Sequence, residues 1–134
     1  MALWPKLDDA QASPEARAVF DDIRASRNTD YVNDIWRVLA NDPALLARTW
    51  EQVKVVMRPG ALDALTKELI YVAVSMTNDC EYCVTTHTGS ARAKGMTEAQ
   101  FGELLAVVGL ANQMNAMVAG TRVEVDERYR GAPQ

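Results

Sequence analysis

The sequence has few of the side chains that most catalytic sites use, and it has no long apolar run. Its 134 residues include only two cysteines and one histidine. Polar residues break every apolar stretch well before the roughly 20 residues that a membrane span needs. Residues 1–9 hold one proline and two aspartates and lack the apolar core of a signal peptide. We therefore expect a cytoplasmic protein with no membrane partner.

Clustered positive charge is also missing. The formal net charge is −4, and the arginines near the C-terminus, Arg122, Arg128 and Arg130, alternate with acidic residues. Contacts to nucleic-acid phosphates need a basic face. We expect no nucleic-acid partner.

Signals for β-structure, internal repeats and nucleotide binding are absent as well. No asparagine–glycine turn and no sustained alternation of apolar and polar residues is present, so no strand is predicted. No glycine-rich dinucleotide motif is present, so we expect no resident cofactor. A length of 134 residues with 49% hydrophobic and 24% charged residues is typical of one packed domain. The prediction is a single all-α domain over 1–134, with 1–12 and 120–134 peripheral.

Residues typical of helix starts and ends predict about six helices. Ser13 followed by Pro14, and Asp42 followed by Pro43, are helix starts. Asp79 is expected to cap a further helix, and Thr97 with Gln100 has the form of a capping box. The predicted helices span about 14–27, 31–40, 43–57, 63–78, 80–94 and 98–119.

Two of these helices, 63–78 and 98–119, are apolar around most of their circumference. Such helices are normally buried, but a chain of this size buries only about 65–70% of its unfolded surface. We therefore expect a homo-oligomer held by apolar helix faces. The alternative is that the first three helices cover both.

The reactive side chains gather within twenty residues, from Glu68 to His87. Cys80 follows the expected cap Asp79, where free backbone N–H groups and the helix dipole stabilise a thiolate. Cys83 and His87 lie three and seven residues further on, so that the imidazole is placed to exchange a proton with a thiol. Glu68, inside an apolar helix, needs a hydrogen-bond partner there, and His87 and the two thiols are the candidates. The pattern predicts a dithiol redox site with a proton relay.

Other interpretations of the same residues remain open at this stage. Zinc sites use the same C-x-x-C spacing, but the usual structural site has four ligands, and this chain offers three plus at best Glu68. We expect no metal, and a non-catalytic metal-binding module is the alternative. Tyr71, Tyr82 and Trp36 are packing residues or candidates to line the pocket.

The chain resembles the AhpD-like alkylhydroperoxidase branch of the carboxymuconolactone decarboxylase family. The matching residues, Glu68, Cys80, Cys83 and His87, form the pattern E-x11-C-x2-C-x3-H. The flanking LTKELIYVAVS and GMTE segments fit the same branch, and VNDIWRVLANDP fits its peroxidase-related members. The resemblance covers about residues 31–119.

This resemblance implies a fold, an assembly and a chemistry. The fold is an all-helical bundle, often a homo-oligomer and commonly a trimer or hexamer. Cys83 attacks a hydroperoxide and becomes a sulfenic acid, Cys80 resolves it to a disulfide, and Glu68 and His87 relay protons. The reductant is a thioredoxin-like or lipoyl-type protein.

One position departs from the best-studied members, which carry a histidine directly before the second cysteine where this chain has Tyr82. The departure makes a general thiol–disulfide oxidoreductase the main alternative to an antioxidant peroxidase. The decarboxylase branch does not depend on a C-x-x-C motif and ranks low. Between the two thiols, the helix dipole favours Cys80 as the more acidic, whereas a neighbouring base favours Cys83. We predict Cys83 as the attacking thiol.

Overall fold

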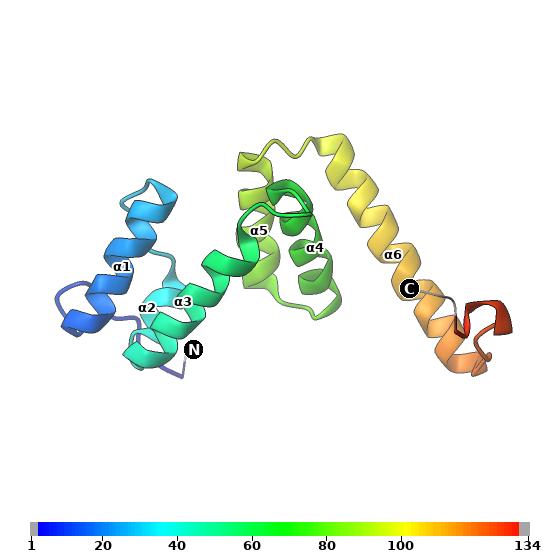
Figure 1. Cartoon of the computed structure of the whole chain (residues 1–134), viewed down its shortest axis with the longest axis horizontal. Helices are drawn as coiled ribbons and strands as arrows, with labels where there is room; N and C mark the ends of the chain where they lie inside the picture. Colours follow the sequence, from blue (N-terminus) through cyan, green and yellow to red (C-terminus); the bar gives the residue numbers. More distant parts are fainter. Residues whose placement is uncertain (1–2, 132–134) are drawn as a thin grey trace. The chain divides into compact units, whose positions relative to one another are not determined.

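The structure is a computed structural model that describes residues 3–131. Within them the chain forms α-helices, one short 3-10 helix and no strand, so the predicted all-α class is confirmed (Figure 1). The elements are α1 (Pro14–Arg27), α2 (Asp34–Leu39), α3 (Pro43–Met57), α4 (Ala64–Thr77), α5 (Glu81–Ala93), α6 (Glu98–Thr121) and the 3-10 helix η1 (Glu127–Tyr129).

Backbone contacts divide the chain into two compact units, 1–58 and 59–134. Each unit is described by itself, and the single domain over 1–134 stays a prediction. Residues 1–2 and 132–134 of the predicted peripheral segments lie outside the described residues.

The first unit packs α1 and α2 against α3 around one apolar core. Phe20, Ile23 and Leu46 are fully buried there. The rings of Trp36 and Trp50 meet edge to face, with their centroids 5.5 Å apart, which is a favoured aromatic geometry. The core therefore consists of apolar residues at helical spacing on α1, α2 and α3.

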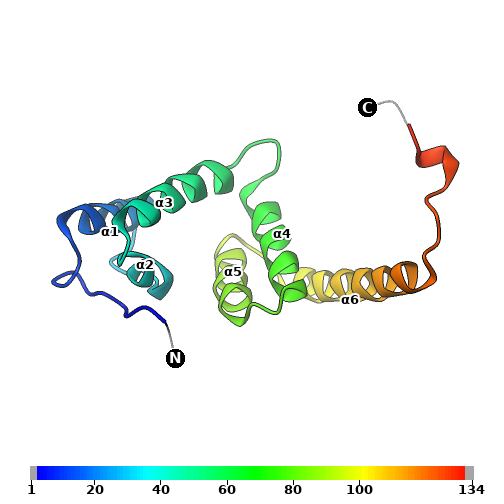
Figure 2. The same ribbon diagram turned by 90° about the horizontal axis from the view of Figure 1, so that it is seen from below.

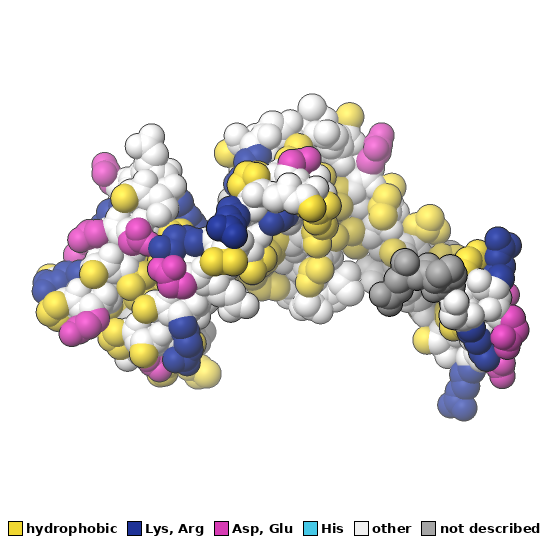
Figure 3. All heavy atoms as spheres, in the orientation of Figure 1, with side chains coloured by type: hydrophobic (Ala, Val, Ile, Leu, Met, Phe, Trp, Pro, Cys, Tyr) yellow, Lys and Arg dark blue, Asp and Glu magenta, His cyan; other side chains and the backbone are white. Residues whose placement is uncertain are grey.

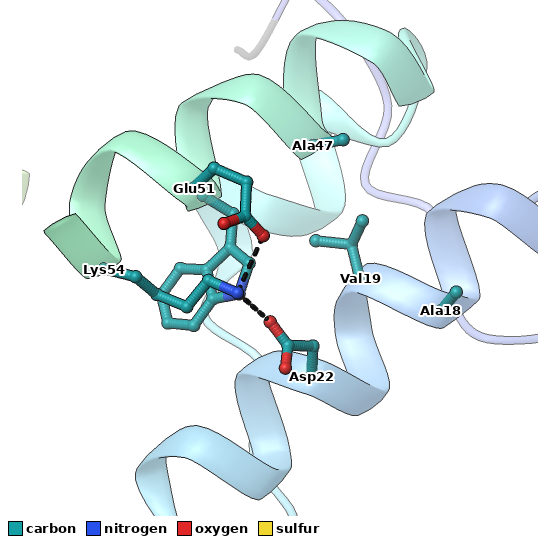
Figure 4. A pocket seen from close by; sticks show the side chains of 7 residues that line it. Ala18, Val19, Asp22, Ala47, Glu51 and Lys54 are labelled. Carbon is teal, nitrogen blue, oxygen red and sulfur yellow. Dashed lines mark hydrogen bonds and ion pairs between the residues drawn. The ribbon is translucent and has the colours of Figure 1, made fainter.

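Ion pairs fasten the rim of this first unit. Asp9 accepts hydrogen bonds from Arg24 at 2.9 Å and from Arg37 at 3.1 Å, which ties the N-terminal segment to α1 and α2. A hollow of about 320 Å³ between α1 and α3 is crossed by Lys54, which bonds to Asp22 at 2.6 Å and to Glu51 at 2.7 Å (Figure 4). Its polar groups are paired with each other, so the hollow offers no unsatisfied partner to a ligand.

The second unit is organised around a hairpin of α4 and α5. Asp63 caps α4 through a hydrogen bond from the Thr66 N–H at 2.7 Å. Gly95, with φ of 96°, ends α5 in a conformation that favours glycine. The two helices run antiparallel, because the start of α4 contacts the end of α5 and the end of α4 contacts the start of α5.

Helix α6 is almost uncovered within its own unit. None of its residues is buried, and Val107, Leu110 and Met117 are at least half exposed. Its C-terminal part extends away from the α4–α5 hairpin in both views (Figures 1 and 2). Apolar side chains remain visible along it (Figure 3). Within the second unit, α6 therefore keeps its apolar faces uncovered, and whether the first three helices cover them stays open.

Helix α6 is also, among residues 3–131, the helix long and apolar enough to cross a membrane by length and composition alone. This differs from the expectation of no such segment. The polar residues Asn112, Gln113 and Asn115 interrupt the apolar runs without lowering the average enough to exclude it. A single helix of this kind is weak support for a membrane protein.

Candidate active site

The site is built on the facing sides of α4 and α5. Glu68 and Ser75, two turns apart on α4, are both buried. Glu68 faces the end of α5, and Ser75 faces its beginning. The hairpin therefore brings Glu68, Cys80, Cys83 and His87, which the sequence analysis selected, into one contiguous strip.

Glu68 and His87 form the central contact of this strip. His87 Nδ1 lies 2.7 Å from Glu68 Oε2. A carboxylate accepts hydrogen bonds and donates none, so Nδ1 carries the proton in the neutral ring and Nε2 is left as an acceptor. Of the candidate partners for the buried carboxylate, the imidazole is the one in hydrogen-bond contact.

Lys94 is a site residue that the sequence analysis missed. Its Nζ lies 2.9 Å from Glu68 Oε1, so the carboxylate holds one donor on each oxygen. Burial raises the pKa of Glu68, but the hydrogen bonds from His87 and Lys94 outweigh burial, and the pKa is lower than its usual value. The spacing could have revealed Lys94, since it follows His87 by seven residues and so shares its helix face.

The N-terminus of α5 differs from the prediction in its cap. Cys80, not Asp79, is the N-cap residue, and its Sγ accepts a hydrogen bond from the Cys83 N–H at 3.4 Å. Asp79 instead adopts a left-handed conformation with φ of 54° and completes the turn after α4. The physical reason is that the turn between α4 and α5 needs a left-handed residue directly before the cap, and aspartate tolerates that conformation better than cysteine. As the cap residue, Cys80 places its sulfur beside the free backbone N–H groups at the start of α5.

The two cysteines are free thiols, and their pKa values are shifted in opposite directions. Hydrogen bonds from the Cys83 thiol and the Cys83 N–H lower the pKa of Cys80. The hydrogen bond to Cys80, burial and the negative charge of Cys80 raise the pKa of Cys83 to about 11. In the resting dithiol the first proton to leave is therefore that of Cys80.

Ser75 supports this pair from α4 and is a second residue that the sequence analysis missed. Its carbonyl accepts a hydrogen bond from the Cys80 N–H at 3.0 Å. Its hydroxyl also contacts the Cys83 thiol and partly offsets the rise in the pKa of Cys83. No sequence signal marks Ser75, because its role depends on the packing of the hairpin.

The three aromatic candidates for the pocket lie in different surroundings. Tyr71 stacks on His87 with ring centroids 3.6 Å apart and planes at 19°. Burial, followed by the nearby Cys83, Cys80 and Glu68, raises the pKa of Tyr71. Tyr82 is 42% exposed on α5, and Trp36 packs in the core of the first unit. A pocket role for Tyr82 and Trp36 stays a prediction.

The described residues contain no group of three or more histidine, cysteine, aspartate or glutamate side chains placed to hold a metal ion. The site brings together two thiols in contact, an imidazole, and a carboxylate that bonds to the imidazole. These features define a class, the all-helical proteins in which a C-x-x-C dithiol lies at a helix start beside a carboxylate–imidazole pair.

Comparison with known proteins identifies the family. The family model of the carboxymuconolactone decarboxylase family matches residues 43–123. The chain belongs to this family, and it is AhpD-like within it. The crystal structure of the alkylhydroperoxidase AhpD core from Rhodospirillum rubrum is 61% identical, covers 96% of this chain and 97% of its own, and has a TM-score of 0.93.

Two curated proteins are similar over shorter stretches. Uncharacterized protein 4 in the cox locus of Paracoccus denitrificans is 40% identical over 78 residues, which are 58% of this chain and 64% of that protein. An uncharacterized protein of Cupriavidus necator is 35% identical over 65 residues, or 48% of this chain and 58% of its own. The chain thus spans less than two thirds of either curated relative.

Proposed function

We propose that this protein is a thiol-dependent peroxidase of the AhpD type. The observation that carries the proposal is the 2.7 Å hydrogen bond between Glu68 on α4 and His87, which lies on the helix that begins with the two contacting free thiols. The similarity to the Rhodospirillum rubrum alkylhydroperoxidase AhpD core supports the same activity. The substrate would be a hydroperoxide.

The proposed catalytic cycle has three steps, in which electrons and protons balance. The Cys83 thiolate attacks one oxygen of the hydroperoxide, the O–O bond breaks, and the leaving alkoxide takes a proton from His87. Cys83 is now a sulfenic acid. The Cys80 thiolate attacks the Cys83 sulfur, a disulfide forms, and the departing hydroxide is protonated to water. An external thioredoxin-like or lipoyl-type dithiol then returns two electrons and two protons.

The unequal acidity of the thiols fits a division of labour. A Cys83 thiol whose pKa is raised to about 11 needs a base before it can attack, and His87 is the proposed base. Cys80, with its lowered pKa, is ready as a thiolate to resolve the sulfenic acid. A thiolate, not a thiol, performs both steps.

A general thiol–disulfide oxidoreductase is the second candidate. The observation in its favour is the position of Cys80 as N-cap, because a low-pKa thiol at a helix start is the usual attacking group in C-x-x-C oxidoreductases. Tyr82, in place of the histidine of the best-studied relatives, favours the same reading. This candidate predicts turnover of disulfides without turnover of peroxides.

We further propose that the protein works in the cytoplasm as a homo-oligomer, a trimer or hexamer. The exposed apolar faces of α4 and α6 support assembly, since soluble proteins seldom leave large apolar patches uncovered. A shallow groove of about 300 Å³ between α4 and α6, lined largely by alanine and valine, belongs to this surface.

The test is a peroxidase assay with several hydroperoxides and several dithiol reductants, run beside Cys83→Ser and Thr86→Ser. Thr86 also lies on α5, and its hydroxyl bonds to the Tyr82 carbonyl, so Thr86→Ser is a matched control that leaves the dithiol intact. We expect wild type and the control to consume peroxide and Cys83→Ser to lose at least 100-fold, about the contribution of one essential group. Stoichiometric zinc with thiols inert to peroxide would instead establish the metal-binding alternative.

A further inference from the structure

We propose that Lys94 is a positioning residue of the redox site, which holds one oxygen of Glu68 so that the other keeps His87 in the Nδ1–H form with Nε2 free as the base. The inference rests on the proposed function for its meaning. Its geometry, however, stands independently of any peroxide chemistry.

The geometry is a chain of two charged contacts. Lys94 Nζ is 2.9 Å from Glu68 Oε1, and His87 Nδ1 is 2.7 Å from Glu68 Oε2. The side chain of Glu68 is 6% exposed, against 39% for Lys94 and 25% for His87. Since both carboxylate oxygens are occupied from α5, Glu68 cannot rotate without breaking one contact.

The charge of Lys94 determines which state of His87 is favoured. A buried carboxylate needs a cationic partner, and Lys94 supplies it without requiring a protonated imidazole. If the ammonium is removed, His87 is the remaining partner, and the imidazolium then becomes more favourable than the neutral ring. A ring that retains its proton is no longer the base that a thiol needs.

The other titratable groups around His87 do not replace this charge. They are Tyr71 on α4, stacked on the ring, and Cys80 and Cys83 on α5. Each of these is neutral or becomes negative at higher pH. Arg92, in the last turn of α5, is a nearby cation, but it bonds to Glu98 of α6 at 3.0 Å and not to Glu68.

A purely structural role for Lys94 is the competing explanation. A cation at the end of a helix stabilises it through the dipole, and Lys94 is the residue at which α5 ends. Arg92 has the same relation to the helix end and does not touch Glu68. Arg92→Met is therefore the matched control for Lys94→Met, and Lys94→Arg keeps the charge.

His87 is the chain's only histidine, so two-bond 1H–15N spectra report its tautomer and titration without ambiguity. In wild type we expect the Nδ1–H tautomer at neutral pH. In Lys94→Met the spectra at neutral pH should show a larger share of imidazolium than in wild type, because Glu68 keeps no other cationic partner. Lys94→Arg and Arg92→Met should titrate as wild type.

The alkylation rate of the thiols by iodoacetamide gives a second readout that needs no peroxidase activity. Its pH profile should differ from that of wild type in Lys94→Met alone. An Nε2–H tautomer in wild type overturns the proposal, even if Lys94→Met does not fold. So does a Lys94→Met titration that matches Arg92→Met. If peroxide turnover is absent but these shifts appear, the proposed function fails and the positioning role stands.

Discussion

At the scale of single residues, the more acidic thiol and the thiol nearer to the proposed base are different cysteines. Cys80 has the lower pKa because its sulfur accepts hydrogen bonds at the start of α5. Cys83 is the thiol that the resemblance and the neighbouring imidazole favour for attack. Peroxide chemistry on the two single variants distinguishes these influences.

We predict that Cys80→Ser still consumes one equivalent of peroxide and stops at a sulfenic acid on Cys83. Cys83→Ser should react at least tenfold more slowly, because the Cys80 thiolate lacks the base. Trapping with dimedone and mass spectrometry locates the modification. A sulfenic acid on Cys80 in Cys83→Ser, formed as fast as in wild type, would reverse the assignment.

A second prediction concerns Glu68 and acid. The lowered pKa of Glu68 in the folded state means that its contribution to stability is present above the usual value of 4.5. That contribution is lost as the pH falls below 4.5 and passes through the lowered pKa. Urea unfolding of wild type should therefore show a free energy that drops below pH 4.5, and Glu68→Gln should flatten this drop.

Glu98→Gln is the control for that measurement. Glu98 is exposed and bonds to Arg92, and surface pairs contribute about 0–1 kcal/mol. Its replacement should leave the acid limb unchanged. An acid limb in Glu68→Gln as steep as that of wild type would show that other carboxylates, such as Asp9 or Asp22, control it.

At the scale of elements, local sequence signals determine where helices begin. Ser13, Asp42 and Asp63 each accept a backbone N–H at their helix start, and Thr97 with Gln100 forms the predicted capping box. These interactions span three residues, so the sequence contains all of their parts. Cys80 as a cap was missed because cysteine is a rare cap and Asp79 beside it a common one.

Contacts between elements were predictable only where chemistry required them. Glu68 needed a partner, and His87 was a candidate, so that pair followed from the sequence. Lys94 lies 26 residues from Glu68, and its contact depends on the antiparallel hairpin. The exposure of α6 could not be read from its composition, because the apolar residues that fill a core also form an interface.

The next prediction concerns the N-terminal cap of α6. Without buried residues, it depends more on its cap than a packed helix does. Thr97→Ala should cost about 1 kcal/mol and speed amide hydrogen exchange in the first turns of α6. Ser13→Ala, an equivalent cap loss on α1, is the matched comparison and should leave exchange in α6 unchanged. Equal protection of α6 in Thr97→Ala and wild type would mean that an interface, not the cap, holds this end of the helix.

At the scale of the whole molecule, the uncovered surface predicts association. Sedimentation at micromolar concentration should give a multiple of the 14.8 kDa chain mass. Leu110→Glu, at a residue 60% exposed on α6, should shift the protein toward monomer because it places a charge in the interface. Val55→Glu, at a similarly exposed position on α3, is the control.

A wild-type protein that stays monomeric would refute the prediction. Flotation with lipid vesicles provides a further check on α6. Its central Asn112, Gln113 and Asn115 are costly in hydrocarbon, so we expect the protein to remain with the aqueous fraction. Flotation that Leu110→Glu abolishes would assign the apolar face to lipid instead.

The placement of the aromatic residues has a practical consequence for spectroscopy. All three tryptophans, Trp4, Trp36 and Trp50, lie within residues 1–58, whereas both thiols lie in the second unit. Indole emission therefore reports on the first unit, and the second unit is observed through its tyrosines, of which Tyr71 stacks on His87. A denaturation curve recorded by fluorescence alone describes the half of the chain that carries no thiol.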